Sequence, residues 1–159
     1  MSDLWYFAYG SNLCRATFEE RRGMQPVARE IGRLAGWRLS FDLPVGPGER
    51  GVANLVADPT AKVHGVAYHL SEADASRLDR TEGVGVGYYW REPVELELYG
   101  GARLGAFTYV SVRGVAGRKP SARYMGLLLD GAREHALSSE WIRHLEAFEL
   151  AVDERIVAG

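Results

Sequence analysis

The sequence predicts an α+β domain whose core is held by a curved or closed, mainly antiparallel sheet. Short strand-like runs, several of them broken by glycine, occupy much of residues 4–112, whereas helical patterns gather near the C-terminal end. No repeated strand–helix–strand unit occurs, which argues against a parallel sheet. Closing such short strands into a barrel is a natural way to bury an aromatic-rich interior.

Length and composition restrict the possible functions. The 159 residues fit a single domain, 1–159, that can bury a core without disulfides or metal. The net charge of -2 shows no basic excess of the kind that nucleic-acid-binding proteins carry. Cys14 is the only cysteine, which excludes an internal disulfide and a cysteine-rich zinc site. Because the chain also shows no signal peptide and no apolar run of roughly 20 residues, we expect a cytoplasmic protein with no nucleic-acid or membrane partner.

The first half of the chain is predicted to consist mainly of strands. These strands cover residues 4–9, 27–43, 52–57 and 63–70, with a short helix over 15–22 and a loop over 44–51. A sharp loop at residues 10–12 ends the first strand. Gly32 and Gly36 interrupt the second strand, where bends or bulges are expected. Asp58 and Pro59 have the turn chemistry that would join the last two strands as neighbours.

The second half is predicted to hold a hairpin and three helices. The helices cover residues 72–82, 124–135 and 141–150, preceded by Ser71, Ser121 and Ser138, and the hairpin strands cover 88–99 and 102–112. Asp74 completes a capping box for the first helix, and Gly83 can end it in a left-handed conformation. Gly100 and Gly101 form the strongest hairpin signal. Pro93 indicates a bulged or edge strand.

Glu82 is the first candidate for chemistry because its helical phase is unusual for a charged residue. Ala75, Leu78 and Glu82 are spaced i, i+3 and i+7, so they share the apolar stripe of the helix. A carboxyl group that points inward should have a raised pKa, as a general acid and base requires. The alternative is a helix-end glutamate frayed into solvent. Asp79 lies close to the same stripe and is the competing base.

The loop at residues 10–12 is a second candidate. Successive backbone N–H groups after a strand can bind an anion or a developing oxyanion, although Gly-Ser-Asn is also an ordinary turn. Ser11 lies in no Gly-x-Ser-x-Gly elbow, so it is not expected to be a nucleophile. Three tyrosines in apolar runs can be core residues or ligand contacts. They are Tyr89, Tyr109 and Tyr124.

Metal and nucleotide sites are not indicated. The four histidines lack metal-ligand spacing, and no metal is expected. They are His64, His69, His135 and His144. The glycine-rich segment at residues 83–87 follows a helix and precedes a strand, the reverse of the dinucleotide-binding order, and no lysine follows it. We interpret it as a connection beside Glu82, with an anion- or nucleotide-binding protein as a lower-ranked alternative.

Two motifs together resemble the gamma-glutamylcyclotransferase family. They are YFAYGSNL at residues 6–13 and LDRTEGV at residues 78–84, the latter followed by GYY at 87–89. Similarity continues in family order over much of the chain, at residues 27–29, 37–41, 63–68, 120–124 and 131–134. The resemblance implies a small mixed β-barrel with flanking helices.

The resemblance also implies an activity. In this family Glu82 would be the catalytic acid and base, and a gamma-glutamyl substrate would cyclise on itself to release 5-oxoproline and an amine without a cofactor. The implied substrate-binding residues are Tyr6, Phe7, Ala8, Tyr9, Gly10, Ser11, Asn12, Tyr89, Tyr109 and Tyr124. A binding protein of the same fold without turnover is the alternative. The leaving amine stays open among amino acids, other amines and antibiotic intermediates, and the chain is expected to be a monomer or homodimer.

Overall fold

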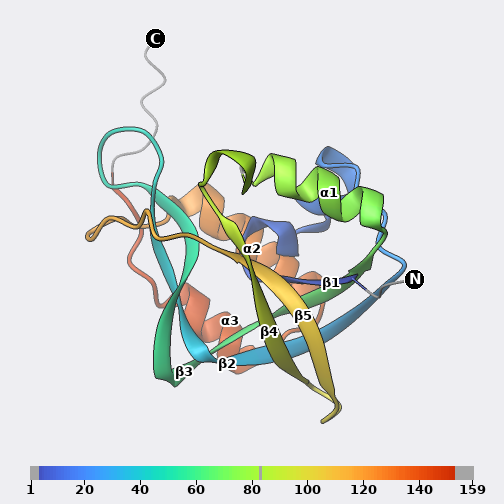
Figure 1. Cartoon of the computed structure of the whole chain (residues 1–159). Helices are drawn as coiled ribbons and strands as arrows, with labels where there is room; N and C mark the ends of the chain where they lie inside the picture. Colours follow the sequence, from blue (N-terminus) through green and yellow to red (C-terminus); the bar gives the residue numbers. More distant parts are fainter. Residues whose placement is uncertain (1–3, 83, 153–159) are drawn as a thin grey trace.

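Five strands close into one barrel in the part of the chain that the computed structural model describes, residues 4–82 and 84–152 (Figure 1). They are β1 Leu4–Ala8, β2 Ala28–Pro44, β3 Gly51–Leu70, β4 Trp90–Leu98 and β5 Arg103–Val110. Their order around the barrel is β1-β3-β2-β4-β5. Neighbours run antiparallel except β1 and β5, which meet in parallel where Tyr6 pairs with Phe107. The predicted mixed, mainly antiparallel barrel is therefore confirmed.

The prediction of two strands at residues 52–57 and 63–70 was wrong, because both belong to β3. The two halves do not pair with each other; both pair with β2, from Pro44 opposite Gly51 to Ala28 opposite His69. Because β3 pairs with β2 on both sides of Asp58 and Pro59, the chain does not reverse direction at these residues.

A bulge accommodates these residues instead. The pairing moves from Ala35 opposite Lys62 to Trp37 opposite Ala57, so residues 58–61 leave the ladder. The Asp58 carboxylate accepts hydrogen bonds from the backbone N–H of Thr60 at 2.9 Å and from its hydroxyl at 2.7 Å. On β2, Gly36 has φ +89° at this irregularity, a conformation that glycine adopts without steric cost. The expected bulge at Gly36 is thus confirmed, with Asp58 supplying local turn chemistry inside a strand.

The β4–β5 hairpin has the predicted turn. Regular pairing extends from Trp90 opposite Val110 to Glu97 opposite Arg103, beyond which Gly101 adopts φ +98°. β4 meets β2 only near its C-terminal end, so the edge of β4 beside Pro93 has no strand partner among the described residues. Of the two options for this strand proline, the edge position is the one observed.

Three α-helices flank the barrel: α1 Glu72–Thr81, α2 Ala122–Glu134 and α3 Ser139–Glu146. The predicted caps are confirmed, because the side chains of Ser71, Ser121 and Ser138 each accept the backbone N–H three residues ahead at 3.1 Å. α3 ends four residues earlier than predicted, and Phe148 beyond it packs edge-on against Phe41. The shorter elements are η1 Ser11–Leu13, the π-helical turn η2 Ala16–Arg21 in place of the helix predicted at 15–22, and η3 Val84–Val86. Gly83, predicted to end the first helix, lies outside the described residues.

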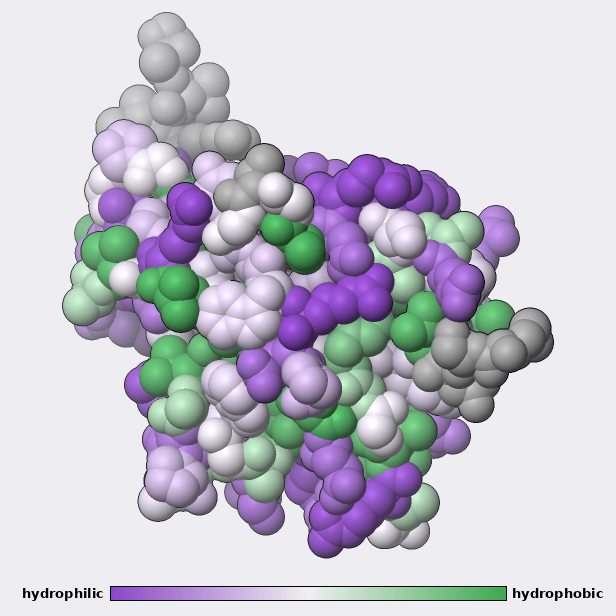
Figure 2. All heavy atoms as spheres, viewed as in Figure 1, coloured by the Kyte–Doolittle hydropathy of each residue, from purple (hydrophilic) through white to green (hydrophobic). Residues whose placement is uncertain are grey.

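α1 lies across one end of the barrel against β1 and β3, while α2 packs on η1 and α3 (Figure 1). The inner residues of α1, Ala75 and Leu78, are fully buried, whereas the outer face of α1 is hydrophilic (Figure 2). The barrel interior below it is aromatic, and the rings of Phe18 and Tyr68 stack at 4.2 Å. This packing places the end of α1 next to the end of β1. None of the described helices is long and apolar enough to cross a membrane.

Candidate active site

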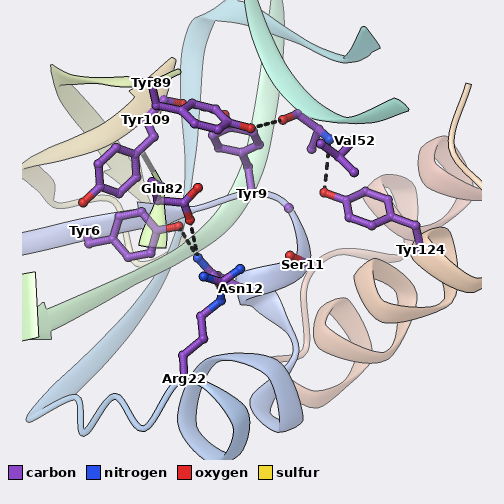
Figure 3. Close-up of a pocket in the computed structure, with 12 residues that line it drawn as sticks. Tyr6, Tyr9, Ser11, Asn12, Arg22, Val52, Glu82, Tyr89, Tyr109 and Tyr124 are labelled. Atoms are coloured by element: carbon purple, nitrogen blue, oxygen red, sulfur yellow. Dashed lines mark hydrogen bonds between the residues drawn. The ribbon is translucent and has the colours of Figure 1, made fainter. Parts of the chain in front are cut away.

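A cavity of about 280 Å³ opens where β1 and α1 end. Its volume lies near the lower limit of the roughly 300–1,000 Å³ typical of small-molecule sites. Residues far apart in the sequence meet there (Figure 3). They are Tyr6, Tyr9, Gly10, Ser11, Asn12, Arg22, Val52, Ala53, Glu82, Tyr89, Tyr109 and Tyr124.

Glu82 caps the C-terminal end of α1 and faces this cavity. Ala75 and Leu78 are fully buried. Because Glu82 lies on the same stripe of the helix, its side chain also points inward. Its Oε1 accepts a hydrogen bond of 3.2 Å from Asn12 Nδ2, and its other oxygen points away from Asn12 (Figure 3). The alternative of a frayed, solvent-exposed glutamate is therefore excluded.

Burial dominates the electrostatics of Glu82. It raises the pKa of the Glu82 carboxyl group above its usual value, while the charge of Arg22 and the hydrogen bond from Asn12 lower that pKa and offset part of the effect. A carboxyl group moved in this direction can both accept and return a proton closer to neutral pH. Among the described residues, Glu82 is the only carboxyl group lining the cavity.

Asn12 links the loop after β1 to Glu82. Its side-chain amide also donates to the hydroxyl of Tyr6 at 3.0 Å, and its backbone carbonyl accepts from the hydroxyl of Tyr68 at 3.0 Å. The first hydrogen bond within η1 runs from the N–H of Leu13 to the carbonyl of Gly10. The N–H groups of residues 11 and 12 precede that bond, so they have no acceptor inside the turn. The N–H of Asn12 is the donor available for an anionic group, whereas that of Ser11 interacts with the hydroxyl of Tyr124.

Two of the predicted tyrosines hold the backbone of Ala53 on β3. The hydroxyl of Tyr89 donates to the Ala53 carbonyl at 3.1 Å, and the Ala53 N–H donates to the hydroxyl of Tyr124 at 3.1 Å (Figure 3). Tyr9 donates to the backbone carbonyl of Tyr109 at 2.5 Å. Hydrogen bonds between residues that themselves line the cavity thus hold its wall in place.

The cavity tyrosines stay protonated near neutral pH. Burial raises the pKa of Tyr124 to about 12, and burial is likewise the largest cause of the raised pKa values of Tyr6, Tyr9, Tyr89 and Tyr109. Their hydroxyl groups therefore serve as neutral hydrogen-bonding groups, and proton exchange near neutral pH is left to Glu82.

Asp79, the competing base, is placed differently. One of its carboxylate oxygens accepts from the hydroxyl of Tyr109 at 2.6 Å and from Nε of Arg91 at 2.8 Å. Asp79 is not among the residues that line the cavity. Its role is to hold Tyr109 in place.

The structure brings together most of the predicted site residues. Phe7 and Ala8 are exceptions: both are fully buried on β1 in the barrel core and are absent from the cavity wall. They lie between Tyr6 and Tyr9, which do line it.

Three residues of the cavity wall were missed, namely Arg22, Val52 and Ala53. Arg22 carried no local signal, since only the fold brings its charge close enough to Glu82 to lower the pKa of that carboxyl group. The Nε of Arg22 is buried without a hydrogen-bond partner among the described residues. Val52 and Ala53 carried no signal, since they are ordinary strand residues that pairing alone brings to this position.

The histidines have structural contacts in the described part of the chain. His64 lies 2.6 Å from the hydroxyl of Tyr99, and burial lowers the pKa of His64 to about 4. His135 contacts Tyr68 and the carbonyl of Leu13. Within residues 4–82 and 84–152, no three His, Cys, Asp or Glu side chains lie together in a way that could hold a metal ion.

The fold and the cavity define a class of proteins, small barrels with a cavity beside one carboxyl group of raised pKa. Comparison with known proteins narrows the class to a family. The model of the AIG2-like family matches residues 62–145, more than half of the chain. The chain belongs to this family, that of the gamma-glutamylcyclotransferases.

Individual relatives agree. The gamma-glutamyl cyclotransferase aclK of Aspergillus oryzae is 32% identical over 164 residues, covering 89% of this chain, which spans 60% of that relative's length. The gamma-glutamylcyclotransferase of Mus musculus is 30% identical over 148 residues, covering 91% of this chain and 78% of the relative. A solved structure of a gamma-glutamyl cyclotransferase superposes with a TM-score of 0.84 at 25% identity, covering 97% of this chain and 92% of the other.

Proposed function

We propose that the protein is a gamma-glutamyl cyclotransferase. One observation carries the proposal: the buried carboxyl group of Glu82 is hydrogen-bonded to Asn12, in the loop whose first backbone N–H groups have no acceptor inside the turn. The relatives named above share the family and support the choice of substrate class.

In the proposed reaction the nucleophile belongs to the substrate. The α-amine of the gamma-glutamyl group attacks the γ-carbonyl carbon, a new C–N bond closes the five-membered ring, and the bond to the leaving nitrogen breaks. The products are 5-oxoproline and a free amine, and no water is consumed. Holding the glutamyl chain folded supplies effective molarity that can reach roughly 10⁵ M in well-oriented cases.

Glu82 would manage the proton. As a carboxylate it removes a proton from the attacking amine, and as an acid it delivers that proton to the departing nitrogen. The backbone N–H of Asn12 would stabilise the oxyanion of the tetrahedral intermediate, an effect worth about 3 kcal/mol per donor.

Arg22 and the tyrosines would position the substrate. The guanidinium of Arg22, whose Nε has no partner among the described residues, suits the α-carboxylate of the glutamyl group. The rings of the five cavity tyrosines would enclose the methylene chain. The hydroxyl groups of Tyr6 and Tyr124, which accept hydrogen bonds from Asn12 and Ala53, would donate to its polar ends.

The test is release of 5-oxoproline from a panel of gamma-glutamyl amides by the purified chain. We expect turnover of at least one member, and a loss of at least about 10²-fold in kcat for Glu82→Gln. Substrate binding without turnover by the unchanged chain would instead identify a binding protein of this fold, and nucleotide binding would favour an unrelated function.

A further inference from the structure

A second cavity, of about 640 Å³, adjoins the first. The two share Val52, Glu82 and Tyr89 as walls. A third cavity, of about 550 Å³, shares Val52 and Tyr124 with the first but does not include Glu82. Glu82 and Tyr89 thus border the second cavity but not the third.

The proton transfer decides between the second and third cavities. In the proposed reaction the departing nitrogen takes a proton from Glu82, so it must lie within hydrogen-bond reach of that carboxyl group. The remainder of the leaving group then extends into the space that Glu82 also borders, which is the second cavity.

The walls of the second cavity are apolar on one side. Leu43, Pro44 and Val52 come from β2 and β3, and the rings of Tyr88 and Tyr89 continue the surface. Tyr88 is 54% exposed, so its ring is accessible at the mouth of this cavity. An apolar group of the leaving amine would cover this surface.

The rim of the same cavity is cationic. The guanidinium of Arg113 lies 4.7 Å from the centre of the Tyr88 ring, and its Nε donates to the carbonyl of Gly87 at 3.2 Å. Arg80 lines the cavity from α1. Neither arginine forms an ion pair with a carboxylate of the described residues, whereas Arg33, Arg91 and Arg103 do. Arg113 is therefore oriented by the Tyr88 ring and the Gly87 carbonyl, and no ion pair to a described residue occupies its guanidinium.

We infer that the second cavity selects a leaving amine that combines a large apolar side chain with a carboxylate, the apolar part resting on Leu43, Pro44 and Tyr88 and the carboxylate on Arg113, with Arg80 adding positive charge. This inference rests on the proposed function and specifies its substrate. Amines without an anionic group, such as polyamines, would be poor leaving groups, since two cations face them.

Three substrates separate the two features. They are gamma-glutamyl-phenylalanine, gamma-glutamyl-phenethylamine, which lacks only the carboxylate, and gamma-glutamyl-glycine, which lacks only the side chain. We expect kcat/KM to be highest for the first and to fall about tenfold or more for the second, as the loss of one charge-assisted hydrogen bond predicts. A similar fall is expected for the third, from the loss of buried apolar area.

Variants then test whether Arg113 binds the carboxylate of the leaving amine. Arg113→Gln should lower the ratio of kcat/KM for phenylalanine over phenethylamine substrates about tenfold. Arg123→Gln, in the third cavity, is the matched control and should leave the ratio unchanged. Equal use of all three substrates, or a ratio that responds to Arg123 and not to Arg113, overturns the inference while the proposed function stands. Release of 5-oxoproline from other gamma-glutamyl amides of the panel but from none of these three also overturns the inference, whereas its absence from the whole panel overturns the proposed function itself.

Discussion

The side-chain amide of Asn12 donates a hydrogen bond of 3.2 Å to the carboxyl group of Glu82, across 70 positions of the sequence. This bond joins the loop after β1 to the end of α1, the two elements that the proposed reaction needs side by side. It also stabilises the charged form of Glu82 and so opposes the effect of burial on its pKa.

Asn12→Ala should therefore shift the pH dependence of catalysis. The free enzyme needs the Glu82 carboxylate as base, so kcat/KM falls on the acid side as Glu82 becomes protonated. Removing a hydrogen bond that lowers the pKa of Glu82 moves this acid limb to higher pH.

A pH–rate profile of 5-oxoproline release measures the shift. Asn54→Ala is the matched control, because Asn54 is a buried asparagine whose amide bonds Asp42 and the carbonyl of Ser111 instead. An acid limb that moves equally in both variants would show that the shift does not depend on the hydrogen bond from Asn12 to Glu82.

Glu82→Gln should change how stability depends on pH. Because burial raises the pKa of Glu82 in the folded state, the folded chain holds this proton at pH values where the unfolded chain, with a pKa of about 4.3, has lost it. The free energy of unfolding contributed by Glu82 is thus fully present below about pH 4.3 and decreases as pH rises through the folded-state pKa.

Glutamine cannot ionise, so the variant loses this dependence. Urea denaturation at pH 4 and pH 7.5 should show the difference in stability, variant minus wild type, becoming more positive at pH 7.5. A difference that becomes more negative would mean that the folded state favours the charged carboxylate.

Asp79→Asn distinguishes the two carboxyl groups near the end of α1. Asp79 holds Tyr109 and Arg91, so we expect a loss of stability of about 1 kcal/mol or somewhat more. Its kcat should fall far less than the roughly 10²-fold or greater loss expected for Glu82→Gln. Single-turnover kinetics and thermal melts give both quantities, and a folded Asp79→Asn chain as inactive as Glu82→Gln would make Asp79 the base.

Arg22→Gln should weaken substrate binding. A charge-assisted hydrogen bond from Arg22 to the α-carboxylate would contribute roughly 1.5–3 kcal/mol, so KM should rise about tenfold or more. Since the charge of Arg22 also lowers the pKa of Glu82, the acid limb of kcat/KM should move to higher pH in the same variant. Arg22→Lys keeps the positive charge, so the acid limb of its pH profile should lie close to that of the wild type, whereas its KM should stay raised. An unchanged KM together with an unchanged limb would remove Arg22 from the site.

Gly131→Ala tests how α2 supports the loop. A Cβ at Gly131 would lie 2.4 Å from the carbonyl carbon of Leu13, so the backbone next to Asn12 must shift. We expect a loss of about 1–3 kcal/mol of stability and reduced kcat. Gly126→Ala on the same helix is the control: its Cβ meets nothing within 4 Å, so stability should rise by up to about 1 kcal/mol. Equal stability of the two variants would show that α2 and the loop are not in close contact.

The sequence by itself determined the class of fold, the hairpin, the three helix caps and the inward phase of Glu82. These features depend on residues close together in the chain: Ser71 and its helix are adjacent, and Ala75, Leu78 and Glu82 lie within two turns. Local spacing and hydrogen bonding are sufficient to specify them.

Only the tertiary structure decided that β3 is one strand, that Asp79 is held by Tyr109 and Arg91, and that Arg22 joins the cavity. Each depends on a partner tens of residues away or on the barrel's closure, which brings Val52 and Ala53 to the site without any local signal. Pairing with β2 keeps β3 continuous through Asp58 and Pro59, because a bulge satisfies the turn chemistry there without breaking the ladder.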